Sequence, residues 1–195
     1  MKKIILILSV FILIGSLQSQ AQKNDQLVVE FNYNISLPMG QFKDFISETG
    51  TRGFEFEMKY MLNDKMAVGG NLAWYGFTEE FPRSTYYFEG GALTAQVWNY
   101  LTVFPIRAVF TYHFLPDGDV NPYVGLLTGA YFVDRDSDIG YYSIREKTWH
   151  FGLTPKLGCY FPMKSQTTEW GFNFNIKYNY ILYDQTGLNN KEWNN

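Results

Sequence analysis

From residue 27 to residue 182, apolar side chains recur at every second position, which is the period of a β-strand and not of a helix. The clearest run is 169–182, where every second residue is apolar and the residues between are mostly polar or glycine. Its apolar members are Trp170, Phe172, Phe174, Ile176, Tyr178, Tyr180 and Leu182. Residues 30–37 and 53–60 repeat the pattern, and no stretch predicts a helix of useful length. The chain is therefore predicted to be all-β.

Seven strands are predicted, and the connections between them alternate between long and short. The strands are expected at 27–37, 53–61, 66–77, 93–114, 122–133, 147–161 and 168–182. The connections contain 15, 4, 15, 7, 13 and 6 residues in chain order, and the short ones carry the Asn, Asp, Gly and Pro of tight turns. This asymmetry is typical of an antiparallel up-and-down transmembrane β-barrel with short periplasmic turns and long outer loops.

The aromatic content indicates which face of the sheet points outward. Phe, Trp and Tyr make up 19% of the chain, and the interior of an eight-stranded barrel is only just filled by side chains. The apolar face is therefore expected to meet lipid. Near strand ends, the aromatic residues expected in the interfacial belts are Trp74, Trp98, Trp149, Trp170 and Tyr183. A soluble lipocalin-like barrel, with an apolar lumen, is the alternative with the same period.

If the polar face points inward, charges of both signs meet in the lumen. The predicted polar network contains Glu30, Glu55, Glu57, Lys59, Arg107, Lys156, Glu169 and Lys177. A packed core of mutually paired charges is favoured over an open ion path, because an eight-stranded lumen is too tight for an aqueous channel.

The strand count leaves one strand unaccounted for, because single-chain bacterial barrels use an even number. Eight strands are expected, and the tail after Leu182 looks like an outer loop, so the closing strand is missing or not recognisable and truncation is the favoured explanation. Pro105 and Pro155 lie inside predicted strands, so a bulge or bend is expected at both. The upper part of 93–114 is expected to project beyond the membrane.

The first 21 residues have the composition of a signal peptide. Lys2 and Lys3 precede an apolar run at 4–17, which is shorter than the roughly 20 residues of a membrane-spanning helix. Small residues allow cleavage after Ala21, which leaves 22–195 as one exported barrel domain.

Composition also excludes several classes of partner and cofactor. Outside the leader, 14 basic side chains face 19 acidic ones without a basic cluster, which argues against nucleic acid. The single Cys159 allows neither an internal disulfide nor a lipid anchor. Residues 134–138 are acidic, but the glycine and glutamate of an EF-hand calcium loop are absent after them. No cofactor and no metal site are expected.

An enzyme is the weakest of the functional predictions. His150 lies on an inward position with Ser143 and Glu146 before it, and His113 is expected at the opposite rim. Two histidines at opposite rims cannot serve one site, and the residues around His150 have no recognisable catalytic spacing. No catalytic residue is assigned.

Local motifs carry a family resemblance. They are 36–40, 52–54, 122–125, 129–131 and 149–153, with the sequences SLPMG, RGF, PYVG, GAY and WHFGL. On these motifs the chain resembles the small outer-membrane β-barrel families, the porin-superfamily domains similar to OmpA, OmpX and OmpW. The resemblance implies an outer-membrane location, a lipid bilayer as partner and insertion by the outer-membrane assembly machinery. It names no surface ligand.

The predicted function is a structural or surface-interaction role in the outer membrane. The barrel is the anchor, and the loops 38–52, 78–92 and 134–146 form the contact surface. A narrow porin-like channel for small solutes is the alternative, followed by a lipid-modifying enzyme that uses His150.

Overall fold

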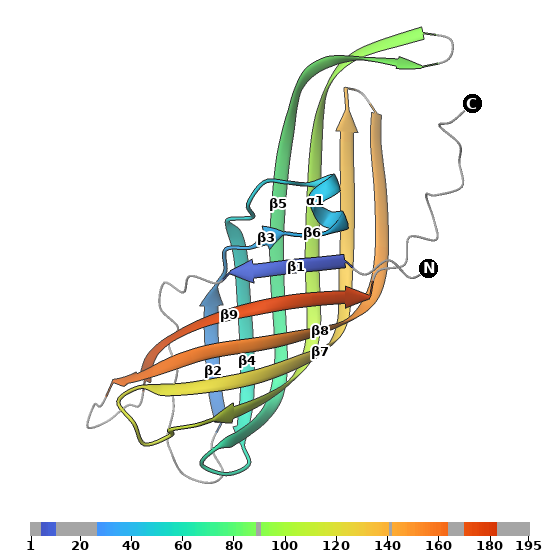
Figure 1. Ribbon diagram of the computed structural model, residues 1–195. Helices are drawn as coiled ribbons and strands as arrows, with labels where there is room; N and C mark the ends of the chain where they lie inside the picture. Colours follow the sequence, from blue (N-terminus) through green and yellow to red (C-terminus); the bar gives the residue numbers. More distant parts are fainter. Residues whose placement is uncertain (1–4, 11–26, 89–90, 141, 164–169, 183–195) are drawn as a thin grey trace.

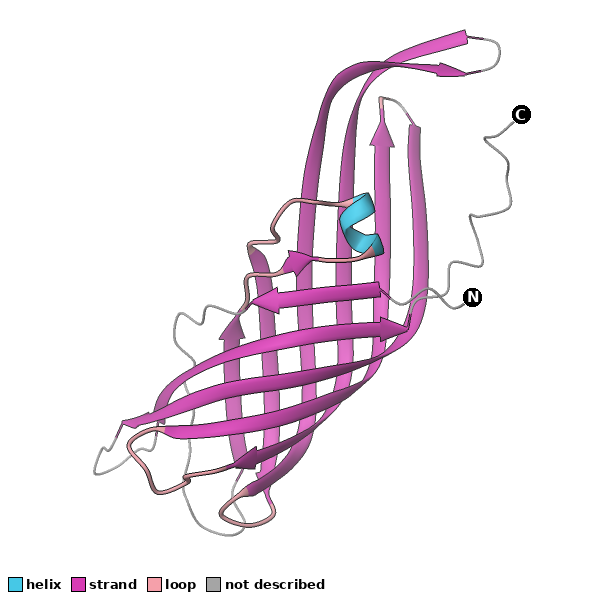
Figure 2. Cartoon of the chain, in the orientation of Figure 1, coloured by secondary structure: helices cyan, strands magenta, loops and turns pink. Residues whose placement is uncertain are grey.

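The computed structural model describes residues 5–10, 27–88, 91–140, 142–163 and 170–182 (Figure 1). One antiparallel sheet dominates it and curls around an interior (Figure 2). Its long strands pair in chain order: β2 (Leu27–Tyr33), β4 (Arg52–Met61), β5 (Met66–Phe88), β6 (Gly91–His113), β7 (Asn121–Ile139), β8 (Tyr142–Met163) and β9 (Trp170–Leu182). The predicted all-β, up-and-down architecture is confirmed.

Two short strands complete the sheet beyond β9. Strand β1 (Ile5–Val10) pairs antiparallel with β9, and β3 (Leu37–Pro38) pairs with β1. A segment of the predicted leader thus occupies the second edge of β9 (Figure 1). The proposed cleavage site at Ala21 and any closing strand after Leu182 lie outside the described residues.

Several strands run farther than the sequence predicted. Residues 78–88 belong to β5, and 134–139 and 142–146 belong to β7 and β8, so the predicted loops 78–92 and 134–146 were wrong. Instead, two paired hairpins project from the sheet, and β5 and β6 extend farthest (Figure 1). The apolar alternation of β5 ends near residue 77, but backbone pairing continues between polar residues such as Thr85 and Thr94, whose hydroxyls lie 2.9 Å apart.

A bulge or bend was expected at Pro105 and Pro155, and the register of the strands shows no bulge at either. On one side of Pro105 the pairing of β5 with β6 stops at Leu72↔Ile106 and resumes in the same register at Tyr75↔Val103. The pairing of β8 with β9 is interrupted in the same way beside Pro155. A proline removes one ladder donor, and here the neighbouring pairs hold the register. The register shift between β5 and β6 lies instead between Phe81 and Ser84.

The two faces of the lower sheet separate apolar from ionic side chains. Phe54 and Leu157 point outward and are 60% and 62% exposed, whereas Glu57 and Lys177 point inward and are fully buried. Residues alternate between these faces along each strand, as the pleat requires. No helix in the described part of the chain is long and apolar enough to cross a membrane. The one helix there, α1 (Gln41–Phe45), lies inside the loop between β3 and β4.

Candidate functional site: the charged interior and the outer rim

The interior of the sheet gathers the predicted polar network. Seven of its eight members point inward and are at most 3% exposed: Glu30, Glu55, Glu57, Lys59, Arg107, Lys156 and Lys177. Glu169 lies outside the described residues. These side chains come from five strands, β2, β4, β6, β8 and β9, and they meet because inward positions at one height converge toward the barrel axis.

The lower part of the network is an alternating row of acids and bases. Lys59 binds Glu30 on β2 and lies 3.0 Å from Glu57 on its own strand. The Lys156 Nζ donates to Glu57 across the interior at 2.6 Å. Each charge therefore faces a partner of opposite sign, which a buried charge requires.

Arg107 organises the upper part of the network. Its Nη2 donates to Glu55 Oε2 at 3.0 Å and to Asn71 Oδ1 at 2.6 Å, and its Nη1 donates to Asn179 Oδ1 at 3.0 Å. Lys177 is the second partner of Glu55. Asn71 and Asn179 were not predicted as members of the network, although both are at inward positions of the same alternation. The guanidinium is held by strands far apart in the chain.

Tyrosine rings fill much of the remaining interior space. Tyr131 packs over Gly152, where a Cβ would stand 2.5 Å from the ring. Tyr123 packs over Gly158 in the same way and donates to Asn173 Oδ1 at 2.6 Å. The glycines leave room that the rings occupy, so the interior is a packed polar core.

The first loop closes the outer end of this core. Phe42 and Ile46, on and just after α1, are fully buried in an apolar cluster with Phe77, Leu101 and other inward residues. The guanidinium of Arg135 lies 5.3 Å from the ring centre of Phe42. The loop 38–52 was predicted as exposed contact surface, and for these two side chains that prediction was wrong. Their spacing of four residues places both on one side of a helical turn, which is a signal the sequence contained.

An aromatic row marks a boundary on the outward face. Cross-strand pairs and neighbouring positions place six rings side by side over six strands: Tyr33, Phe54, Trp74, Phe104, Phe132 and Trp149. Trp74 and Trp149 were predicted belt residues. Trp98 lies six residues beyond Phe104 along β6, about 20 Å farther out, so it is not part of this row.

The next outward position above the aromatic row is polar. Register pairs connect Arg52 with Gly76, Gly76 with Thr102, Thr102 with Asp134, and Asp134 with Lys147. Amphipathic rings collect at the headgroup level of a bilayer. The step from rings to polar residues therefore gives the height at which the sheet leaves the membrane.

The two histidines lie at opposite ends of the sheet. His150 Nε2 lies 2.8 Å from Thr148 Oγ1, while the Ser143 hydroxyl donates to Asp136. Ser143 is seven residues away along the same strand, about 23 Å. His113, at the opposite end of the sheet, contacts Asn121. The described residues contain no group of three or more potential ligands for a metal ion.

An antiparallel sheet with lipid-type side chains outside, paired charges inside and an aromatic row at one rim has the architecture of a transmembrane β-barrel. The chain belongs to the family of the outer membrane protein β-barrel domain, which it matches over residues 7–194. Family membership places the protein in the outer membrane.

Among solved structures, the chain is similar to Ail, the attachment invasion locus protein of Yersinia pestis. The two share 12% identity over 93% of this chain and 99% of Ail, with a TM-score of 0.33. No curated protein matches the chain in sequence.

Proposed function

We propose that this protein is an outer-membrane anchor that holds rigid β-hairpins at the cell surface for contact with another macromolecule. One observation carries the proposal. Strands β5 and β6 are paired from Gly76↔Thr102, just above the aromatic row, to Phe88↔Gly91, with one register shift between Phe81 and Ser84. This length corresponds to about 40 Å of ordered hairpin beyond the rim.

The second hairpin offers side chains suited to an interface. Tyr142 and Ile144 near its tip are 73% and 56% exposed. Arg145 on the neighbouring position pairs with Asp134 at 2.8 Å and remains largely exposed. Aromatic and arginine side chains are enriched in protein interfaces. A rigid scaffold that presents them binds with a small entropic cost.

The packed interior argues against the alternative of a narrow solute channel. A continuous water path would have to separate the ion pairs around Glu55 and Glu57 and displace Phe42 and Ile46 from the mouth. We expect no steady conductance in planar bilayers. We also expect His150→Ala to leave the lipid profile of the outer membrane unchanged, since the protein is proposed not to be an enzyme.

Export by a signal peptide cleaved after Ala21, followed by insertion through the outer-membrane assembly machinery, completes the proposal. Cleavage would remove β1 from β9, and a strand edge within hydrocarbon needs a partner. We expect an eighth strand between β9 and β2. Asn34, just after β2, and Asn175 on β9 support this, because both are buried with side-chain atoms that lack hydrogen-bond partners among the described residues.

Photo-cross-linking on intact cells tests the contact role. A photoreactive amino acid at Ile144 is expected to give adducts with macromolecules outside the barrel, and the same group at Leu157 is expected to give lipid adducts alone. Conductance at the level of a porin, with no macromolecular adduct at Ile144, would favour the channel. N-terminal sequencing of the protein from outer membranes checks the cleavage site.

A further inference from the structure

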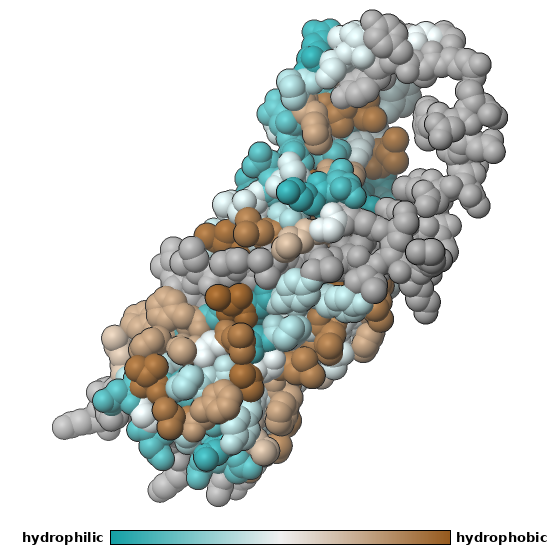
Figure 3. All heavy atoms as spheres, in the orientation of Figure 1, coloured by the Kyte–Doolittle hydropathy of each residue, from teal (hydrophilic) through white to brown (hydrophobic). Residues whose placement is uncertain are grey.

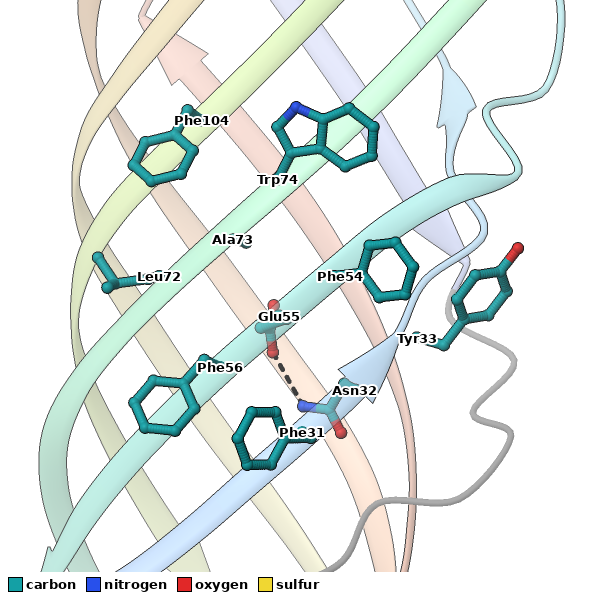
Figure 4. A pocket seen from close by; sticks show the side chains of 10 residues that line it. All are labelled: Phe31, Asn32, Tyr33, Phe54, Glu55, Phe56, Leu72, Ala73, Trp74 and Phe104. Atoms are coloured by element: carbon teal, nitrogen blue, oxygen red, sulfur yellow. Dashed lines mark hydrogen bonds between the residues drawn. The ribbon is translucent and has the colours of Figure 1, made fainter.

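A groove lies on the lipid side of the barrel, just below the outer rim. It has a volume of about 470 Å³ and crosses β2, β4, β5 and β6. Figure 4 shows its walls, which are mostly rings that point outward: Phe31, Tyr33, Phe54, Phe56, Trp74 and Phe104. Phe31 and Phe56 pack at 5.0 Å at one end, and Phe54 and Trp74 stack at 6.4 Å nearer the rim. The groove is therefore an apolar, elongated recess.

A cation stands at the upper end of this groove. Arg52 precedes Phe54 by two residues in β4, so it lies on the same outward face about 7 Å higher. Its side chain is exposed, and no carboxylate among the described residues lies within the 4.0 Å of an ion pair. Its partner across the strands is Gly76, and the Trp74 ring covers the outward side of that glycine, where a Cβ would stand 3.0 Å from the ring. Arg52 is therefore at headgroup height, at the end of the groove that Trp74 lines.

We propose that the groove and Arg52 together form a binding site for one membrane lipid with an anionic, phosphate-bearing headgroup. The acyl chain lies along the rings, and the phosphate receives hydrogen bonds from the guanidinium, whose planar fork matches phosphate oxygens. The site is distinct from the proposed contact surface on the hairpins, and it rests on the outer-membrane location of the family.

Charge and depth favour a lipid over a peptide as the occupant. The groove lies below the polar positions that follow the aromatic row. Hydrocarbon surrounds the sheet there, and a peptide backbone without hydrogen-bond partners is costly in hydrocarbon. Lys147 is at the same height on β8, but Asp134 lies 4.0 Å from its Nζ. Arg52 has no such carboxylate among the residues that the structure describes, so a phosphate group would supply the opposite charge.

Quenching of Trp74 by brominated lipid tests the site. The full chain carries Trp74 as its single tryptophan, with Trp98, Trp149, Trp170 and Trp193 changed to Phe. It is reconstituted in phosphatidylcholine vesicles that contain increasing brominated phosphatidylglycerol or, in parallel, brominated phosphatidylcholine. We expect the brominated phosphatidylglycerol to associate with the site at Trp74 about fivefold more strongly than the brominated phosphatidylcholine, because one arginine near an anionic surface contributes about 1 kcal/mol. The preference should shrink in high salt.

Substitutions separate the site from a general surface-charge effect. Arg52→Gln should abolish the preference, Arg52→Lys should retain part of it, and Lys147→Gln should leave it unchanged. Equal quenching by the two lipids in the unsubstituted protein would overturn the proposal. So would an equal loss in the Arg52 and Lys147 variants. If Arg52→Gln fails to insert, the salt dependence of the unsubstituted protein is the test. A lipid preference that shrinks in high salt supports the proposal, and one that salt leaves unchanged contradicts it.

Discussion

The molecule has two halves that arrange their side chains in opposite ways, and the aromatic row separates them. Below the row, rings and aliphatic chains point outward while Glu55, Glu57 and Lys156 are buried. Above the row, Phe77 and Leu101 point inward onto the first loop, and the outward positions carry residues such as Asp134. On the face shown in Figure 3, apolar side chains gather in several groups over the lower strands, and hydrophilic ones cover much of the projecting part, with some apolar side chains among them.

This inversion occurs along single strands without a break in pairing. In β6, Arg107 and Leu101 are both inward residues of one strand, six positions apart. The period of two is the same in both halves, and the surrounding solvent decides which face carries apolar groups. Hydrocarbon around the lower half makes an apolar exterior favourable, whereas water around the upper half makes an apolar interior favourable.

The largest expected effect comes from the charged interior. Arg107→Met removes the cation beside Glu55 and leaves a buried carboxylate with one fewer partner. The free energy of unfolding should fall by about 3–5 kcal/mol, as measured by urea titration in vesicles. Arg145→Met is the matched control, because it breaks an exposed ion pair in the upper half and should leave the urea midpoint unchanged. Equal losses in the two variants would contradict the comparison.

A charge on the outward face should distinguish the halves nearly as strongly. Leu157→Arg places a cation in the lipid-facing band and should lower the unfolding free energy by about 2–4 kcal/mol. Tyr100→Arg, on the outward face above the aromatic row and opposite Asp136, should be nearly neutral. Urea titration of both variants in the same vesicles makes the measurement. If Tyr100→Arg lowered the unfolding free energy as much as Leu157→Arg, the membrane boundary would have to lie farther out than the aromatic row.

The smallest effect is expected at the closed mouth. Ile46→Ala removes apolar contacts between the first loop and the upper core, at a cost of about 2 kcal/mol. Hydrogen exchange should speed up at residues 42–47 and stay unchanged around Arg107, because the ion-paired core does not depend on the loop. Faster exchange throughout the lower strands would show that the two halves unfold as one unit.

The sequence predicted the lower half well and the upper half poorly, for one physical reason. Strands that separate lipid from a polar interior show strict alternation, so the seven strands and inward residues such as Lys177 could be identified. In water, backbone pairing continues through residues 78–88, where polar residues are mixed with Phe81, Tyr86, Tyr87 and Phe88 without a strict alternation. The neutral partners of Arg107 also lie at inward positions. They were not predicted as members of the network because only charged residues at such positions require a partner of opposite charge.

Accessibility of single cysteines to a membrane-impermeant maleimide in intact vesicles tests the inversion most directly. In a Cys159→Ser background, cysteines replace Leu157 and Phe151 below the aromatic row and Tyr100 and Arg145 above it, all at outward positions. We expect fast labelling at the two upper positions and almost none at the two lower ones. Fast labelling of Leu157→Cys would contradict the claim that the apolar face meets lipid, and would favour a water-soluble barrel.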